Sequence, residues 1–214
     1  MEKMAVRVPD NHRRETVRLL IEGGFVKIEG TKTLVSGRKA PVYIDLRALA
    51  SNPVAFGGIA AYLRCMVNQL DVASVMGIPH AADQLALGVG MQRAPHIPVI
   101  RIDKPGDTST DPIVYDARDP ETSLRGVALI DDVISDGGSK IRPITYLTSC
   151  GYVVKAMVVV VDRLEGGAAM LQSRFGISTY SLCSIDDIME ALREAGKVSA
   201  EMEEAFTAYR QKYG

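Results

Sequence analysis

Residues 126–140 read GVALIDDVISDGGSK, and this stretch indicates both a fold class and a candidate site. An apolar run, Val127–Ile130, leads into two adjacent aspartates, Asp131 and Asp132. A loop rich in glycine and hydroxyl side chains follows, and a helical pattern begins near Ser139. The order of apolar strand, polar loop and helix is typical of α/β proteins, in which ligands bind where parallel strands end.

The rest of the chain extends this pattern. Short strands rich in Val, Ile and Met alternate with helices, which predicts a central parallel sheet flanked by helices on both faces. The first fifty residues do not alternate this way, so we expect a small N-terminal α+β subdomain at residues 1–50 and an α/β core at residues 51–214. The expected strands lie at 25–28, 33–35, 42–45, 72–76, 99–100, 113–115, 127–130, 153–161 and 179–182, and the expected helices at 11–22, 53–69, 83–92, 139–150, 166–174, 185–194 and 199–212.

Composition argues against several classes of protein. The 214 residues carry a net charge of −1, so no overall basic field favours nucleic acid. The longest apolar run, Ala156–Val161, is too short to cross a bilayer, and Met1–Arg14 is too polar for a signal peptide. The three cysteines show neither metal spacing nor a disulfide framework. We therefore expect a cytoplasmic protein that binds neither nucleic acid nor membrane.

The loop after the two aspartates is suited to a phosphate. Amides at a helix N-terminus carry partial positive charge, and Gly137 and Gly138 allow an anion to approach them closely. Ser135 and Ser139 add hydroxyl donors, although the spacing is neither GxxxxGK[ST] nor GxGxxG. Asp136 brings a negative charge into this loop, and we expect it to cap the helix. Paired carboxylates suit ribose hydroxyls or a hydrated Mg²⁺, whereas a plain strand-to-helix turn would explain only one aspartate.

The letters ALIDDVISDGGS resemble the phosphoribosyl-pyrophosphate (PRPP) motif of the type I phosphoribosyltransferases. Three more stretches resemble segments of the orotate phosphoribosyltransferases, in the family's order: TLVSGRKAPVYIDLR at 33–47, VMGIPHAADQLALGVG at 75–90 and VVVVDRLEGG at 158–167. The resemblance runs from about Phe25 to Leu192. It implies the type I fold with an N-terminal hood, the substrates PRPP and orotate, the products orotidine 5′-monophosphate and pyrophosphate in pyrimidine biosynthesis, Mg²⁺, and a homodimer.

Orotate is a flat anion that needs an apolar or aromatic surface and a cation. Tyr43 suits the ring, and the planar guanidinium of Arg163 suits the carboxylate. The alternatives are a half-buried strand aromatic for Tyr43 and an ion pair with Glu165 or Asp162 for Arg163. The resemblance implies PRPP contacts from Asp131, Asp132, Val133, Ile134, Ser135, Asp136, Gly137, Gly138, Ser139, His80 and Ala81; orotate contacts from Tyr43, Ile44, Ser135 and Arg163; catalytic roles for Asp131, Asp132, Lys104 and Arg101; and Mg²⁺ at Asp131 and Asp132 through PRPP hydroxyls or water.

The polar segment 101–125 resembles the family's catalytic lid but lacks some of its cations. Arg101 matches, while a second lysine is displaced to Lys104 or absent. The departures from the family pattern are Val35 and Ile102, which stand at lysine positions, Pro105, and Asp107, which stands at a His or Tyr position. Fewer cations should slow the departure of pyrophosphate. Two alternatives therefore stay open: a PRPP- or nucleotide-binding protein with little or no turnover, and a phosphoribosyltransferase that acts on another base.

Overall fold

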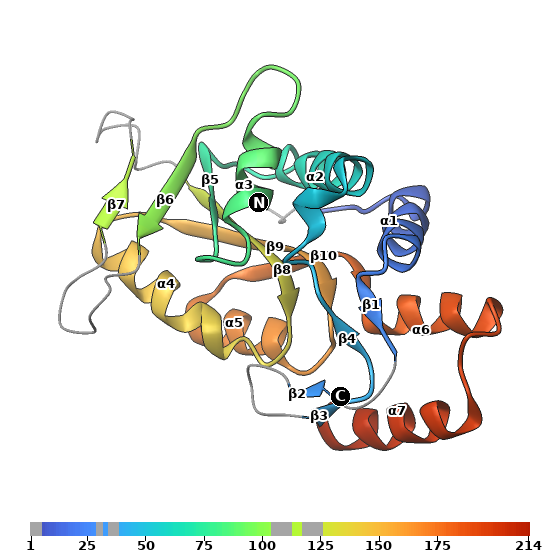
Figure 1. Ribbon diagram of the computed structural model, residues 1–214. Coiled ribbons are helices and arrows are strands. Elements are labelled where there is room, and N and C mark those ends of the chain that lie inside the picture. The colour runs from blue at the N-terminus through green and yellow to red at the C-terminus, as the bar shows by residue number, and fades with distance from the viewer. Residues whose placement is uncertain (1–5, 29–31, 34–38, 104–112, 117–125) are drawn as a thin grey trace.

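A six-stranded sheet lies at the centre of the computed structural model, which describes residues 6–28, 32–33, 39–103, 113–116 and 126–214 (Figure 1). The strand order is β10-β9-β8-β5-β6-β7, and all neighbours are parallel except β6 and β7. The predicted parallel sheet is thus confirmed, with one antiparallel edge strand. The strands are β5 (Ser74–Gly77), β6 (Val99–Asp103), β7 (Ile113–Tyr115), β8 (Val127–Ile134), β9 (Val154–Asp162) and β10 (Ser178–Ser184).

Helices cover both faces of this sheet, as predicted (Figure 1). Alternate residues of β9 face opposite sides: Met157 and Val159 pack in one apolar cluster with α4 and α5, whereas Val158 and Val160 pack in a second cluster with α1, α2, α3 and α6. No described helix has the length and apolarity that a membrane crossing requires. The helices are α1 (Asp10–Glu22), α2 (Pro53–Val67), α3 (Asp83–Gly90), α4 (Gly138–Ser149), α5 (Gly167–Phe175), α6 (Ile185–Glu194) and α7 (Ala200–Tyr213).

Two short antiparallel pairs form the N-terminal hood. Strand β1 (Val26–Lys27) pairs with β4 (Tyr43–Ile44), and β2 (Lys32–Thr33) pairs with β3 (Lys39–Ala40). The sequence pattern indicates a connecting segment where β3 lies, because two residues are too few to show a strand pattern. Val42 and Ile44 of the hood share an apolar cluster with residues of the sheet. A domain boundary at residue 50 stays a prediction.

Strand β8 is longer than the sequence indicated. We predicted its end at Ile130, but it continues to Ile134, because β9 continues beside it and pairs Asp131 with Val159 and Ile134 with Asp162. The two aspartates therefore lie inside the last half of the strand instead of just beyond it. The pairing of β8 with β9 holds the backbone of both aspartates in place, while their side chains differ in burial.

Candidate active site

A cavity of about 650 Å³ lies at the carboxyl ends of β5, β8 and β9. Its wall comes from five parts of the chain: residues 43–47 of the hood, the end of β5 with the β5–α3 loop, Ile102 of β6, the second half of β8 with its loop and the first turns of α4, and Arg163 after β9. Carboxyl ends of parallel strands are where open α/β sheets bind ligands. Four of the segments singled out in the sequence thus meet at one place.

The two aspartates occupy different environments in this cavity. Asp131 is only 1% exposed, and its carboxylate faces the ammonium of Lys140 as an ion pair. Its Oδ1 also accepts a hydrogen bond from the Asp132 N–H at 2.9 Å. Burial raises the pKa of Asp131 to about 7, and the Lys140 charge acts in the opposite direction. Asp132 is half-buried, and its Oδ1 accepts from the Val133 N–H at 2.7 Å.

Glycines give the β8–α4 loop its shape. Gly137 has φ 79°, a left-handed conformation that favours glycine. Gly167 at the start of α5 donates its N–H to the Ser135 carbonyl at 2.9 Å. A Cβ on Gly167 would lie 2.4 Å from that carbonyl oxygen and 2.9 Å from the Gly137 nitrogen, so a larger residue would push the loop away. The EGG part of the DRLEGG motif therefore supports the proposed phosphate loop.

Asp136 bonds the start of α4, which agrees in part with the prediction that it caps the helix. Its Oδ1 accepts a hydrogen bond from the Gly138 N–H at 3.0 Å, although the N-cap position itself is Gly137. The Asp136 carboxylate therefore accepts the hydrogen bond of a backbone N–H group that an anion bound in this loop would otherwise accept.

The predicted PRPP contacts divide into two groups. Asp131, Asp132, Val133, Ser135, Gly138, Ser139 and Ala81 line the cavity, whereas Ile134, Asp136, Gly137 and His80 do not. Ile134 is fully buried, and its carbonyl accepts from the Arg163 N–H at 2.9 Å, so this residue supports the loop from below. The His80 side chain is 62% exposed, with Nδ1 3.6 Å from an oxygen of Asp83.

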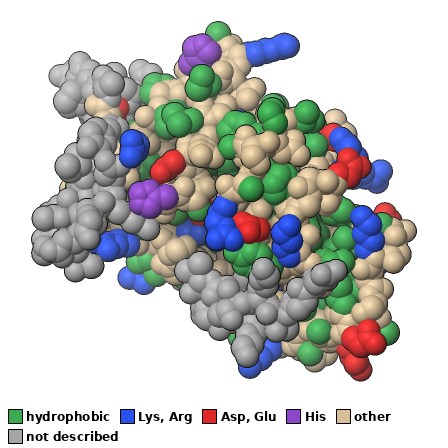
Figure 2. All heavy atoms as spheres, viewed as in Figure 1, with side chains coloured by type: hydrophobic (Ala, Val, Ile, Leu, Met, Phe, Trp, Pro, Cys, Tyr) green, Lys and Arg blue, Asp and Glu red, His purple; other side chains and the backbone are tan. Residues whose placement is uncertain are grey.

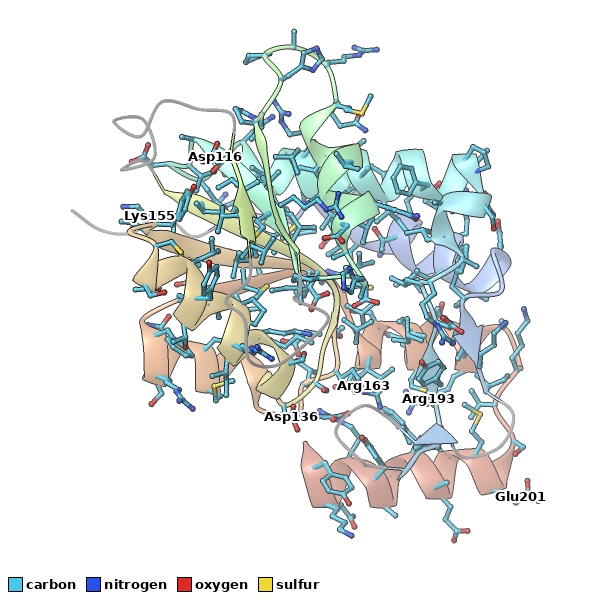
Figure 3. All side chains as sticks on the ribbon, turned by 60° about the vertical axis from the view of Figure 1, so that its left-hand side comes forward. Asp116, Asp136, Lys155, Arg163, Arg193 and Glu201 are labelled. Atoms are coloured by element: carbon cyan, nitrogen blue, oxygen red, sulfur yellow. The ribbon has the colours of Figure 1, made fainter. Side chains whose placement is uncertain are left out.

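The residues predicted to contact orotate line the cavity, and Arg163 is held by contacts within the protein. Tyr43 and Ile44 line the cavity together with Arg163. Arg163 Nε lies 2.6 Å from Glu165 Oε1, and Nη1 donates to the Val42 carbonyl at 3.0 Å. Figure 3 shows this arginine just above helix α7, whose Tyr209 ring lies 5.7 Å from its guanidinium carbon. The ion pair that we considered as the alternative role is therefore formed, and these contacts use two of the five N–H donors of a guanidinium.

The described part of the segment 101–125 is poor in cations toward the cavity. Ile102 is 3% exposed and lines the cavity wall at the position where the family pattern has a lysine. Arg101 is exposed on β6 and lies outside the lining. The predicted features Lys104, Pro105, Asp107 and Val35 lie outside the described residues.

Several residues that line the cavity were not predicted from the sequence. Helix α4 presents Ser139, Arg142, Pro143 and Tyr146 to the cavity, at the spacing i, i+3, i+4 and i+7 that marks one helix face. That spacing could have identified them once Ser139 was chosen as a candidate. Lys140 and Arg47 also line the cavity. Arg47 Nη2 lies 2.6 Å from Asp45 Oδ2, and this hydrogen-bonded guanidinium holds the pKa of Asp45 below its usual range.

Figure 2 shows basic and acidic side chains next to one another at the centre of the face of the molecule that it displays. Within the described residues, no three His, Cys, Asp or Glu side chains gather as a metal cage. One carboxylate of the acidic pair already faces an ammonium. The donor set therefore suits a hydrated Mg²⁺ that arrives with PRPP better than a resident metal ion.

Comparisons with known proteins agree with this geometry. No protein-family model matches the chain. The chain is 30% identical over 181 residues to the orotate phosphoribosyltransferase of Pyrococcus abyssi, a match that covers 84% of this chain and 96% of that protein. It is 33% identical over 187 residues to the uridine 5′-monophosphate synthase of Bos taurus, which covers 86% of this chain and 38% of that protein.

Among solved structures, the UMP synthase of Leishmania donovani superposes with a TM-score of 0.81 at 24% identity, over 94% of this chain and 42% of that one. The chain thus spans less than half the length of the two UMP synthases that it matches. Its fold is that of the type I phosphoribosyltransferases. From its similarity to the Pyrococcus abyssi enzyme over most of both chains, the protein belongs to the orotate phosphoribosyltransferase family.

Proposed function

We propose that this protein transfers the phosphoribosyl group of PRPP to orotate, giving orotidine 5′-monophosphate and pyrophosphate. The observation that carries the proposal is the meeting, in one cavity, of the acidic pair, the glycine–hydroxyl loop, Tyr43 and Arg163. Each of these groups matches one part of the two substrates. We further propose that the protein acts in the cytoplasm as a homodimer, a state that light scattering of the purified protein would test.

The β8–α4 loop would hold the sugar end of PRPP. The amides and hydroxyls of Ser135–Ser139 suit the 5′-phosphate, because this segment runs into the N-terminus of α4. The ribose hydroxyls would donate to the carboxylates of Asp131 and Asp132. Asp132 is the more exposed of the two, so it makes the larger share of this contact.

The hood would orient the base. Tyr43 offers an aromatic surface to the flat ring, and Arg163 offers N–H donors to the orotate carboxylate. A ring N–H of orotate then faces the anomeric carbon, whose bond to pyrophosphate breaks as the new C–N bond forms, and the ring proton passes to the departing pyrophosphate or to water. Orientation of the two substrates and stabilisation of the departing charge supply the catalysis. Mg²⁺ bound with PRPP at Asp131 and Asp132 would supply charge neutralisation for the leaving group.

The direct test is a turnover assay. Purified protein, PRPP and Mg²⁺ are mixed with orotate, uracil, adenine or guanine, and the loss of each base is followed. We expect loss of orotate absorbance with release of equimolar pyrophosphate. Turnover of another base in place of orotate would contradict the proposed acceptor while keeping the enzyme class.

The acidic pair offers the sharpest variant. Asp132→Asn removes a charged acceptor while keeping the side-chain volume, and loss of such a charge-assisted contact weakens binding by roughly 1.5–3 kcal/mol, or about 10- to 150-fold. Calorimetric titration with PRPP measures this change. Asp71→Asn is the matched control, because Asp71 is exposed and lies outside the cavity. Equal PRPP affinity in Asp132→Asn and wild type would mean that the sugar binds elsewhere.

One observation favours a second candidate, a PRPP-binding protein with weak turnover. The apolar side chain of Ile102 forms cavity wall where the family pattern has a lysine, which removes a cation near the leaving group. The same assay separates the candidates. PRPP binding without measurable pyrophosphate release would favour the second, and release that depends on orotate would favour the first.

A further inference from the structure

Lys140 is a buried lysine on the wall of the candidate active site. It is 7% exposed and lines the cavity, at the end of the first turn of α4. Lysine is almost never buried without a partner, because removing an ammonium from water is costly. A buried ion pair is also weak evidence of a contribution to stability, since apolar residues of similar volume often stabilise a protein more. The position of Lys140 therefore calls for a reason other than stability.

The contacts of Lys140 join the two ends of the proposed phosphate loop. Its ammonium pairs with Asp131 and donates to the Val133 carbonyl at 3.1 Å, both on strand β8. It also donates to Ser139 Oγ at 2.9 Å, in the first turn of α4. These are three oxygen atoms, as many as the N–H groups of an ammonium. The ion pair and the two hydrogen bonds of Lys140 thus all go to oxygen atoms of β8 and α4 on either side of the loop, while the residue also lines the cavity.

Two of these partners are residues that the proposed function assigns to PRPP. In the proposed complex Asp131 would face the ribose hydroxyls and Ser139 would lie beside the 5′-phosphate. An ammonium that contacts both side chains sets their spacing before any ligand binds. A spacing that is already formed lowers the entropy cost of ordering these two side chains when a ligand binds. It also favours a ligand that carries the ribose hydroxyls and the phosphate together.

We propose that Lys140 is a positioning residue that fixes Asp131 and Ser139 at the spacing of the hydroxyls and the phosphate of a sugar phosphate. The inference rests on the proposed function and deepens it. Its ligand class is the ribose 5-phosphate portion of PRPP. Pyrophosphate and orotate, which lack this pair of groups, do not depend on Lys140 for binding.

Selective loss of ligand affinity tests this role. Calorimetry compares ribose 5-phosphate, PRPP, pyrophosphate and orotate binding to wild type, Lys140→Met and Lys140→Gln. We expect Lys140→Met to weaken ribose 5-phosphate and PRPP by about 10- to 100-fold, by analogy with the range seen when the partner that orients a metal-binding side chain is removed. Pyrophosphate and orotate should stay within about twofold, since Lys140 contacts none of the side chains proposed to bind them and only the Ser135 contact of orotate lies in this loop. The control is Lys155→Met, an exposed lysine at the opposite end of β9 from this loop (Figure 3).

A double-mutant cycle shows whether Lys140 acts through Asp131. Asp131→Asn combined with Lys140→Met leaves no lone buried charge, so it is also the variant to use if Lys140→Met does not fold. We expect the double variant to lose less affinity for ribose 5-phosphate than the two single losses combined, because the part of the Lys140 effect that passes through Asp131 is already absent in Asp131→Asn and only the part that passes through Ser139 remains.

Several results would overturn the inference. Wild-type affinity for ribose 5-phosphate in Lys140→Met is one, and an equal loss for all four ligands, which indicates only a damaged fold, is another. A double variant weaker than Asp131→Asn by the full Lys140→Met factor is a third. Failure of the wild type to bind PRPP and ribose 5-phosphate at all would be a different result, and it would reject the proposed function together with this inference.

Discussion

Two buried ion pairs stand at the carboxyl ends of neighbouring strands, and they do different things. Asp131 lies on β8 and Lys140 in the first turn of α4, nine positions apart in sequence. Arg163 and Glu165 follow β9, and their further contacts reach far along the chain: Arg163 donates to Val42 in the hood, and Tyr209 of α7 donates to Glu165 at 2.8 Å. One pair shapes a loop, while the other joins the hood, the sheet and the C-terminal helix.

Two buried ion pairs of similar chemistry should therefore have different effects, because they connect different parts of the molecule. Breaking the local pair should change the affinity for a ligand, because the loop it shapes is small and close to the cavity. Breaking the long-range pair should change the stability of the whole molecule, because three separate segments lose a common contact. The following predictions test this division, beginning with the largest effect.

Glu165→Ala should destabilise the protein the most. It leaves the Arg163 guanidinium, 3% exposed, without its carboxylate, and removal of one partner from a buried pair costs about 3–5 kcal/mol. Urea unfolding followed by circular dichroism measures the free energy of unfolding. Glu203→Ala is the control, because its pair with Arg193 is exposed and should change stability far less. Equal losses in the two variants would show that the Arg163 pair does not join the three segments as described.

Tyr209→Phe should have a smaller effect of the same kind. It keeps the ring beside Arg163 but removes the hydroxyl that donates to Glu165 Oε1. A hydrogen bond to a charged group contributes roughly 1.5–3 kcal/mol, so the free energy of unfolding should fall by about that amount. Orotate affinity, measured in parallel, should change little, since the hood contact of Arg163 is retained. A stability equal to wild type would mean that α7 is held by its apolar contacts alone.

Asp136→Asn should improve ligand binding by a modest factor. The amide side chain keeps an oxygen for the Gly138 N–H and removes the negative charge beside the proposed phosphate site. Single charges about 6 Å apart in water repel by roughly 0.7 kcal/mol, so ribose 5-phosphate should bind about threefold more tightly. The gain should shrink as salt is added, because salt screens exposed charges. Weaker binding in this variant would show that the carboxylate itself is needed to hold the loop in place.

The sequence was sufficient for features that depend on neighbouring residues. The apolar strand, the two aspartates and the glycine–hydroxyl loop lie within fifteen residues, so the β8–α4 loop was predicted from local pattern, and the parallel sheet was predicted from the alternation of strands and helices along the chain. Features that depend on tertiary contacts were missed. Nothing around Lys140 indicates that its ammonium turns inward to Asp131. The end of β8 was placed four residues early, because it depends on the partner strand β9.

Residues at long range were harder still. The resemblance gave Arg163 a role toward orotate, but its contacts with Val42 and Glu165 require the hood and the sheet to be assembled. Strand β3 has two residues and is defined only by its pairing with β2. The residues that α4 presents to the cavity, in contrast, follow helical spacing from Ser139 and could have been predicted from the sequence.

The measurement that tests the central claim most directly is a crystal structure of the protein with ribose 5-phosphate. We expect the phosphate on the backbone amides of residues 135–139, with the ribose hydroxyls at the carboxylates of Asp131 and Asp132. Density for the sugar phosphate at another place in the molecule, with the β8–α4 loop empty, would contradict the account.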